Sequence, residues 1–397
     1  MAGRTLTPTK SRTATEAELG KSKSQQQIVW EQFRKHKAAL VGGVILIIMY
    51  LATAFAGFLA PYGINEYRRF PVTSNMPPTN VHWRDPVTGG LTRPFIYNYG
   101  QERDAVTRQR IYVENPEEGV FPIKFFVRRP EASYKLFGIW ESDLHLFGVD
   151  EPARVFLWGT NSLGKDVFSR VLYGGQISLT IGIIAIWVSF FLGLLMGGLA
   201  GYYGGWVDNL IMRFIEVLDA IPPLFLLITL AALLRDPGNP IAQAIGLRMN
   251  SAQVYLMIVV VLGFIGWGGL ARVIRGQVLS AREQDYAQAA KALGASNSRV
   301  MWRHLIPSTA SYVIVFLTLA IPSYILGEVA LSFLGLGPSE VDTSSWGLML
   351  RDATARGISI QFVPWLLIPG IPIFFAILSW NLLGDGLRDA FDPKKRR

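Results

Sequence analysis

The segment Trp158 to Arg170 contains the one spacing in the chain that could cradle a phosphate. Gly159, Gly164 and Lys165 are placed as in a phosphate-binding loop, after the apolar residues 155–157. Such a loop needs Ser or Thr after its lysine to hold magnesium. This chain has Asp166 there, and a carboxylate at that place would repel phosphate oxygens. The sequence therefore argues against nucleotide binding at this loop.

Three carboxylates lie in or beside strongly apolar runs, where a charge is costly. Glu328 is well inside such a run, whereas Glu216 and Asp219 are near the end of another. Intramembrane carboxylates usually face a cavity or a partner, so the three are candidates for a substrate pathway. A packing role remains the alternative for Glu328, and a hydrated structural role is favoured for Glu216 and Asp219.

The residue types of the chain do not indicate any other catalytic site or a metal site. The chain has no cysteine, which excludes disulfides, thiolate nucleophiles and zinc–thiolate sites. Its four histidines are not at metal-ligand spacing, and no H-E-x-x-H motif occurs. We expect no catalytic residues, no bound metal and no enzymatic activity in this chain.

The composition is that of a membrane protein with several spans. Hydrophobic residues make up 50% of the chain, charged residues 17%, and the mean hydropathy is +0.30. The net charge of +9 could suggest nucleic acid. Its cations gather instead in the N-terminal tail, in a loop near residue 290 and at 394–397, which is a positive-inside pattern. We therefore expect no nucleic-acid partner.

The apolar runs predict six membrane-spanning helices. We expect a cytoplasmic tail with an interfacial helix (1–37), a first span (38–60), an extracytoplasmic insert (61–176), a five-helix core (177–387) and a basic cytoplasmic C-terminus (388–397). Recurrent prolines and short runs of β-formers make the insert β-rich. The core spans fall near 177–201, 214–234, 254–270, 310–334 and 364–383.

Two patterns within the core predict helix packing and bending. Gly193, Gly197 and Gly201 share one helix face, where a second helix can approach closely. Pro222 and Pro223 should kink the third span.

A charged, alanine-rich loop interrupts the core at 271–309. Ser280 and Glu283 have capping-box spacing, Gly294 stands where a helix should end, and a second short helix should end before Pro307. Two short helices around a glycine could form a knob that fits a partner's groove.

Four motifs resemble those of dipeptide and oligopeptide permeases of ABC importers. The Gln288-Ala289-Ala290, Gly294 and Pro307 pattern resembles their EAA loop, with Gln288 in place of the usual Glu. The other three motifs resemble the signatures around G-T-D-x-x-G-R-D-x-x-S-R, E-A-x-L-S-F-L-G-L-G and L-G-D-G-L-R-D; they begin at Gly159, Glu328 and Leu383.

The resemblance implies an all-α membrane protein with six helices of the type I ABC importer permease fold. It implies a second homologous permease, two cytosolic ATPases that bind ATP and magnesium, and an extracytoplasmic solute-binding protein, all at a bacterial or archaeal cytoplasmic membrane. The loop would couple to the ATPases through Gln288, Ala289, Ala290, Gly294 and Pro307. Nickel chelates or oligosaccharides are alternative cargoes, and an autonomous channel or ion-driven carrier is the alternative class.

Overall fold

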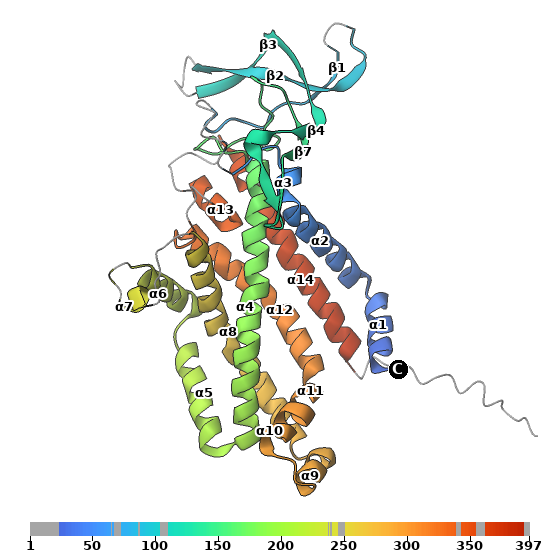
Figure 1. The fold of residues 1–397 in the computed structure, drawn as a ribbon, viewed down its shortest axis with the longest axis vertical. Coiled ribbons are helices and arrows are strands. Elements are labelled where there is room, and N and C mark those ends of the chain that lie inside the picture. Colours follow the sequence, from blue (N-terminus) through green and yellow to red (C-terminus); the bar gives the residue numbers. More distant parts are fainter. Residues whose placement is uncertain are drawn as a thin grey trace, which may run out of the picture.

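The computed structural model describes residues 24–64, 66, 73–85, 88–103, 110–236, 238, 240–244, 251–338, 343–354 and 362–392. The predicted tail at 1–23 and the basic residues at 394–397 lie outside this range. In Figure 1 a bundle of long helices carries a β-rich region at one end and a group of short helices at the other. We call these ends the insert end and the loop end.

The described residues of the insert form seven strands that pair in antiparallel fashion, which confirms the β-rich prediction. A three-stranded sheet joins β1 (His82–Arg84), β2 (Leu91–Arg103) and β3 (Arg110–Pro122). Strand β4 (Lys124–Arg128) pairs with β7 (Leu144–Gly148), and β5 (Tyr134–Leu136) pairs with β6 (Trp140–Ser142) in a hairpin. A buried apolar cluster that includes Ile96, Phe147 and Val155 holds the strands together.

Five segments of the described chain are long and apolar enough to cross a membrane. They are α2 (Lys37–Ala54), α4 (Val167–Tyr203), α8 (Ser251–Ala281), α12 (Ala310–Phe333) and the segment from the 3₁₀ turn Pro364–Leu367 through α14 (Gly370–Phe391). Shorter helices flank them: α1 (Gln25–Lys35), α3 (Ala56–Leu59), α7 (Pro240–Ala244) and α13 (Trp346–Thr354).

The expected third span is broken rather than kinked. Helix α5 (Gly205–Asp219) ends before the proline pair, and α6 (Pro223–Arg235) starts at Pro223 as a separate helix. Proline removes a backbone donor and clashes with the preceding turn, and two in succession stop the helix. The prediction of one continuous helix over 214–234 was therefore wrong in detail. Five of the six predicted spans fall on the long apolar segments of the described chain, and the predicted third span falls on this pair of shorter helices.

The glycine face of α4 packs against α8, as predicted. A Cβ on Gly197 would lie 2.5 Å from the Ala271 carbonyl oxygen, and one on Gly201 would lie 2.7 Å from that of Arg275. A Cβ on Gly193 would lie 2.9 Å from the Leu270 side chain. Only glycine permits this backbone approach, so the glycines allow α4 and α8 to pack closely along this face.

Candidate functional site

The loop end carries a compact knob of short helices between α8 and α12 (Figure 1). It contains α9 (Asp285–Ala292), α10 (Asn297–Arg299), a π-helical turn (Val300–Leu305) and α11 (Ile306–Ser308). We call residues 282–309 the coupling loop, after the role that the sequence predicts for it.

Gly294 ends α9 in the predicted way. Its φ is +80°, and its amide donates to the Lys291 carbonyl at 2.9 Å. The next amide, of Ala295, donates to the Ala290 carbonyl at 3.0 Å. These two bonds form the Schellman motif, which a residue with a Cβ disfavours at this φ. The end of α9 is therefore set by one glycine.

The predicted capping box at Ser280 is wrong. Ser280 lies in the last turn of α8, which continues to Ala281, and α9 begins at Asp285 with Gln284 as its N-cap. The apolar spacing of α8 reaches Val278, which is buried, so packing extends the helix past the hydroxyl.

Hydrogen bonds tie the coupling loop to the end of α4. The Tyr202 hydroxyl donates to the Asn297 side-chain oxygen at 2.7 Å, and the Arg282 guanidinium donates to the Tyr202 carbonyl at 3.2 Å. The side-chain amide of Gln288 donates to the backbone carbonyl of Arg282 at 3.0 Å. A glutamate side chain could not donate this bond, so the replacement of the usual Glu by Gln288 has a structural use here.

An apolar cluster beneath the knob adds to these bonds. Its buried members come from α4, α8, α12 and the loop itself: Tyr202, Leu270, Ile274, Val278, Ala287, Val300, Met301, Leu305 and Val313. Ala287 is the residue of α9 that faces inward, a role that the motif alone did not assign.

A second side of α9, together with the residue that caps its end, carries exposed apolar side chains. Leu293 is 89% exposed and Tyr286 is 44% exposed, and Ala289 lies between them on the same face. Of the other predicted coupling residues, Gln288, Gly294 and Pro307 are exposed and Ala290 is partly buried. An apolar face on a firmly held helix is suited to dock on a protein partner.

Glu328 is fully buried and is held by hydroxyl groups. Ser178 of α4 donates to one carboxylate oxygen at 2.8 Å, and Ser332, one turn along α12, donates to the other at 2.6 Å. The Ser178 hydroxyl also accepts from the Trp346 amide at the start of α13 at 3.2 Å. The carboxylate thus links three helices. Its serine partners were not predicted, because Ser178 is 150 residues away in the sequence.

Glu216 and Asp219 take part in ion pairs at the C-terminal end of α5, the end that leads to α6. Glu216 accepts from Arg213 at 2.9 Å, and Asp219 accepts from Arg272 of α8. All four side chains are substantially exposed in the isolated chain. The structure places both carboxylates apart from Glu328, which lies farther along the bundle.

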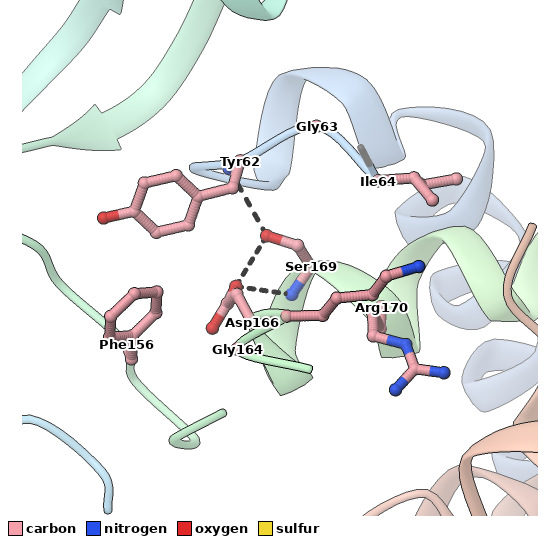
Figure 2. Close-up of a pocket in the computed structure, with 9 residues that line it drawn as sticks. Tyr62, Gly63, Ile64, Phe156, Gly164, Asp166, Ser169 and Arg170 are labelled. Atoms are coloured by element: carbon pink, nitrogen blue, oxygen red, sulfur yellow. Dashed lines mark hydrogen bonds between the residues drawn. The ribbon is translucent and has the colours of Figure 1, made fainter. Parts of the chain in front are cut away.

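At the insert end, the motif Gly159 to Arg170 forms a buried polar cluster around the start of α4 (Figure 2). Asp166 caps the helix, and one of its oxygens accepts from the Ser169 amide at 2.8 Å and from the Ser169 hydroxyl at 2.6 Å. Ser169 in turn accepts from the Tyr62 amide at 3.3 Å. Burial raises the pKa of the Asp166 carboxyl to about 7, against the opposing effect of the Ser169 bonds.

A second carboxylate of this cluster joins α13 to the same motif. The Asp352 carboxylate accepts from the side-chain amide of Asn161 at 2.5 Å, from the Ser162 hydroxyl at 3.1 Å and from the Arg170 guanidinium at 3.2 Å. The arginine and aspartate are both almost completely buried. Arg170 and Asp352 are 182 residues apart in the sequence, so the motifs alone did not predict this contact.

The glycines of the same motif face the chain itself. A Cβ on Gly159 would lie 2.6 Å from the Met76 carbonyl oxygen, and one on Gly164 would lie 2.7 Å from the Thr73 hydroxyl. Residues of the insert thus occupy the surface that a phosphate-binding loop presents to its ligand. Among the residues that the structure describes, no group of three histidine or acidic side chains is placed to hold a metal ion.

Comparisons with known proteins point to one family. The family model described as binding-protein-dependent transport system inner membrane component matches residues 175–397. The model described as the N-terminal transmembrane domain of oligopeptide transport permease C matches residues 24–78.

Individual relatives extend the match over nearly the whole chain. The dipeptide transport system permease protein DppC of Bacillus subtilis is 31% identical over 377 residues, which is 95% of this chain and 88% of that protein. The oligopeptide transport system permease protein OppC of Haemophilus influenzae is 39% identical over 242 residues, 60% of this chain and 70% of that protein. The glutathione transport system permease protein GsiD of Escherichia coli is 40% identical over 243 residues, covering 61% and 74%.

Proposed function

The chain belongs to the family of binding-protein-dependent transport system inner membrane components, and we propose that it forms half of the translocation pathway of an ATP-driven importer of di- or oligopeptides. Relatives named for dipeptide, oligopeptide and glutathione transport support the choice of cargo. Nickel chelates and oligosaccharides are competing cargoes, and uptake by a strain that carries the complete transporter separates them from peptides.

The observation that carries this proposal is the exposed apolar face of α9. Leu293, Ala289 and Tyr286 are presented on a helix that polar bonds and a buried cluster hold to the ends of α4, α8 and α12. A channel or an ion-driven carrier has no need of such a face. An ATPase that docks there would pass its closing motion to three long helices at once.

The proposal requires partners that the chain does not contain. A second homologous permease completes the pathway, and two cytosolic ATPases dock on the coupling loops and bind ATP and magnesium. A solute-binding protein delivers cargo at the insert end. The permease itself has no catalytic step, and its two access states are populated according to nucleotide and binding protein.

The test of docking is a charge placed on the α9 face. Ala289→Arg should leave the permease in the membrane but abolish recovery of the ATPases with it, because a buried guanidinium without a partner is costly. Leu91→Arg is the control, since Leu91 is 88% exposed at the other end of the molecule. Normal ATPase recovery and uptake by Ala289→Arg would remove the docking claim. Persistent recovery of the unaltered chain without any ATPase would favour the channel.

We place the chain in a bacterial or archaeal cytoplasmic membrane, with both termini and the coupling loop inside the cell. The arginines of the loop region support this orientation through the positive-inside rule. Asn80 is exposed on the insert, and the chain has no native cysteine. Asn80→Cys should therefore react with an impermeant thiol reagent in intact cells or spheroplasts. Labelling only after lysis would show that the insert is on the cytoplasmic side and would contradict the proposed topology.

A further inference from the structure

The insert exposes a group of large apolar side chains next to the helices. Phe126 of β4 and three residues at the turn of the β5–β6 hairpin, Phe137, Ile139 and Trp140, are each more than half exposed, with Ile139 at 74%. We call these four residues the aromatic tip. Clustered apolar side chains of this size usually mark a surface that is covered in the working protein.

The backbone of the tip adopts conformations that bulky residues avoid. Phe126 has a φ of +56°, and Phe137 has a φ of +52°. Phe137 and Gly138 are the central residues of the hairpin turn, which the Ile139 amide closes with a bond to the Leu136 carbonyl at 3.1 Å. Turns with two positive φ values strongly prefer Asn-Gly. Phe137 occupies the first of these two positions, where asparagine is usual. Its positive φ strains the backbone, and the turn exposes an apolar side chain to solvent.

Contacts with α3 and the end of α2 set the position of the tip. The Phe137 ring lies 5.7 Å from that of Phe55, the residue that ends α2, and the Phe126 ring lies 6.2 Å from that of Phe58. At the base of the hairpin, Tyr134 packs on Gly57, where a Cβ would lie 2.2 Å from its ring. Because the base meets Gly57 and the turn meets Phe55, the hairpin descends towards the membrane-spanning part of α2.

The tip continues the exposed apolar stripe of the first span. Five large residues of α2 and its end follow one helix face at intervals of three or four: Leu40, Val44, Ile47, Leu51 and Phe55. The stripe ends at Phe55, where Phe137 takes over. Arg128 and Lys135, both exposed, lie beside the tip on β4 and β5, where they can meet lipid phosphates.

We infer that the aromatic tip enters the headgroup region of the lipid leaflet at the insert end and anchors the insert to the bilayer beside α2. The occupant of this surface is the membrane. Aromatic side chains are favoured at that depth because the region accepts their apolar bodies without full dehydration. The inference does not depend on the cargo or on docking of the ATPases.

A fluorophore at the tip tests the inference in the complete transporter. Ile139→Cys gives a single attachment site in this chain for an NBD label, since the chain has no cysteine, and the labelled permease is then assembled with its partners. In vesicles whose lipids carry a nitroxide near the headgroup, we expect about a twofold loss of emission relative to unmodified lipid, because interfacial side chains lie about 5–10 Å deep. Leu91→Cys, at the start of β2, should give water-like, unquenched emission.

A second substitution tests whether the contact between the hairpin and α3 sets the position of the label, and the quenching itself separates lipid from protein as the occupant. Gly57→Ala should push Tyr134 away and reduce the quenching at position 139, whereas Gly63→Ala, where a Cβ meets nothing within 4 Å, should not. Water-like emission from position 139 in the transporter would overturn the inference. So would blue-shifted emission that nitroxide lipids do not quench, because that result assigns the surface to a protein partner.

Discussion

The docking face of α9 makes a quantitative prediction at Leu293. Its side chain is 89% exposed, so Leu293→Ala should leave the stability of the fold unchanged. Full burial of a leucine against a partner is worth about 1.5–3 kcal/mol. A loss of about 2 kcal/mol weakens binding about 30-fold, since about 1.4 kcal/mol is a factor of ten. We therefore expect about a 30-fold increase in the Kd of the ATPase for the permease.

The measurement is a titration of purified ATPase onto the permease heterodimer in lipid nanodiscs. Leu91→Ala is the matched control, because Leu91 is 88% exposed on the insert and should have no effect on this Kd. Peptide uptake should fall with occupancy when the ATPase is limiting. An unchanged Kd for Leu293→Ala, or an equal change for Leu91→Ala, would refute the assignment of α9 as the docking face.

Three further substitutions test contacts inside the chain. Gly197→Val should destabilise the packing of α4 on α8 by about 1–3 kcal/mol, because its Cβ would lie 2.5 Å from a carbonyl oxygen; an unchanged Tm in detergent would contradict this. Tyr202→Phe should keep ATPase binding but lower uptake, because it removes a bond of about 1 kcal/mol between α4 and the coupling loop; Tyr203→Phe is the control, and equal uptake by both would disprove the link. The folded chain raises the pKa of Asp166 from 3.8 to about 7, so ionisation opposes folding and the Tm should fall as the pH rises from about 4 to about 7. Asp166→Asn keeps the helix cap and should flatten this fall, and a pH dependence that survives the substitution would exclude Asp166 as its source.

Local patterns in the sequence predicted local structure well. The predicted packing of α4 through its glycines was correct because small residues at intervals of four allow a second helix to approach closely. The predicted end of α9 at Gly294 was correct because few residues other than glycine tolerate its φ. The capping box at Ser280 failed where a tertiary contact prevailed, since burial of Val278 keeps α8 helical beyond the hydroxyl. The proline pair predicted a kink in one helix, but the sequence did not show that the bend would be large enough to divide it into two helices.

Contacts between distant segments were not predictable from motifs. The Glu328 carboxylate was recognised as costly, but its hydroxyl donor Ser178 lies 150 residues away. Asp352 and Arg170 belong to two separate motifs whose contact is visible only in the fold. The aromatic tip was missed because Phe137-Gly138 lacks the usual turn chemistry, and the strain that accompanies it is a property of the backbone.

Helix α4 connects the two ends of the molecule and gives the transport cycle a mechanical element. Its 37 residues span about 55 Å, from the cap Asp166 in the insert-end cluster to the region of Tyr202, whose hydroxyl bonds to Asn297 of the coupling loop. The glycine face joins it to α8 along one side, so the two helices are expected to move as one body.

No comparable contact locks α5 to α6. At their junction the Ala220 amide still donates to the Glu216 carbonyl. Pro222 and Pro223 have no amide hydrogen to donate, so the regular bonding of the helix is interrupted and the backbone angles can change there at low cost. If an ATPase docks on α9 as proposed, we expect its movement to rock the α4–α8 pair as one body about this break. The proline pair would then act as the hinge, and the long helices would carry the displacement of the coupling loop towards the insert end.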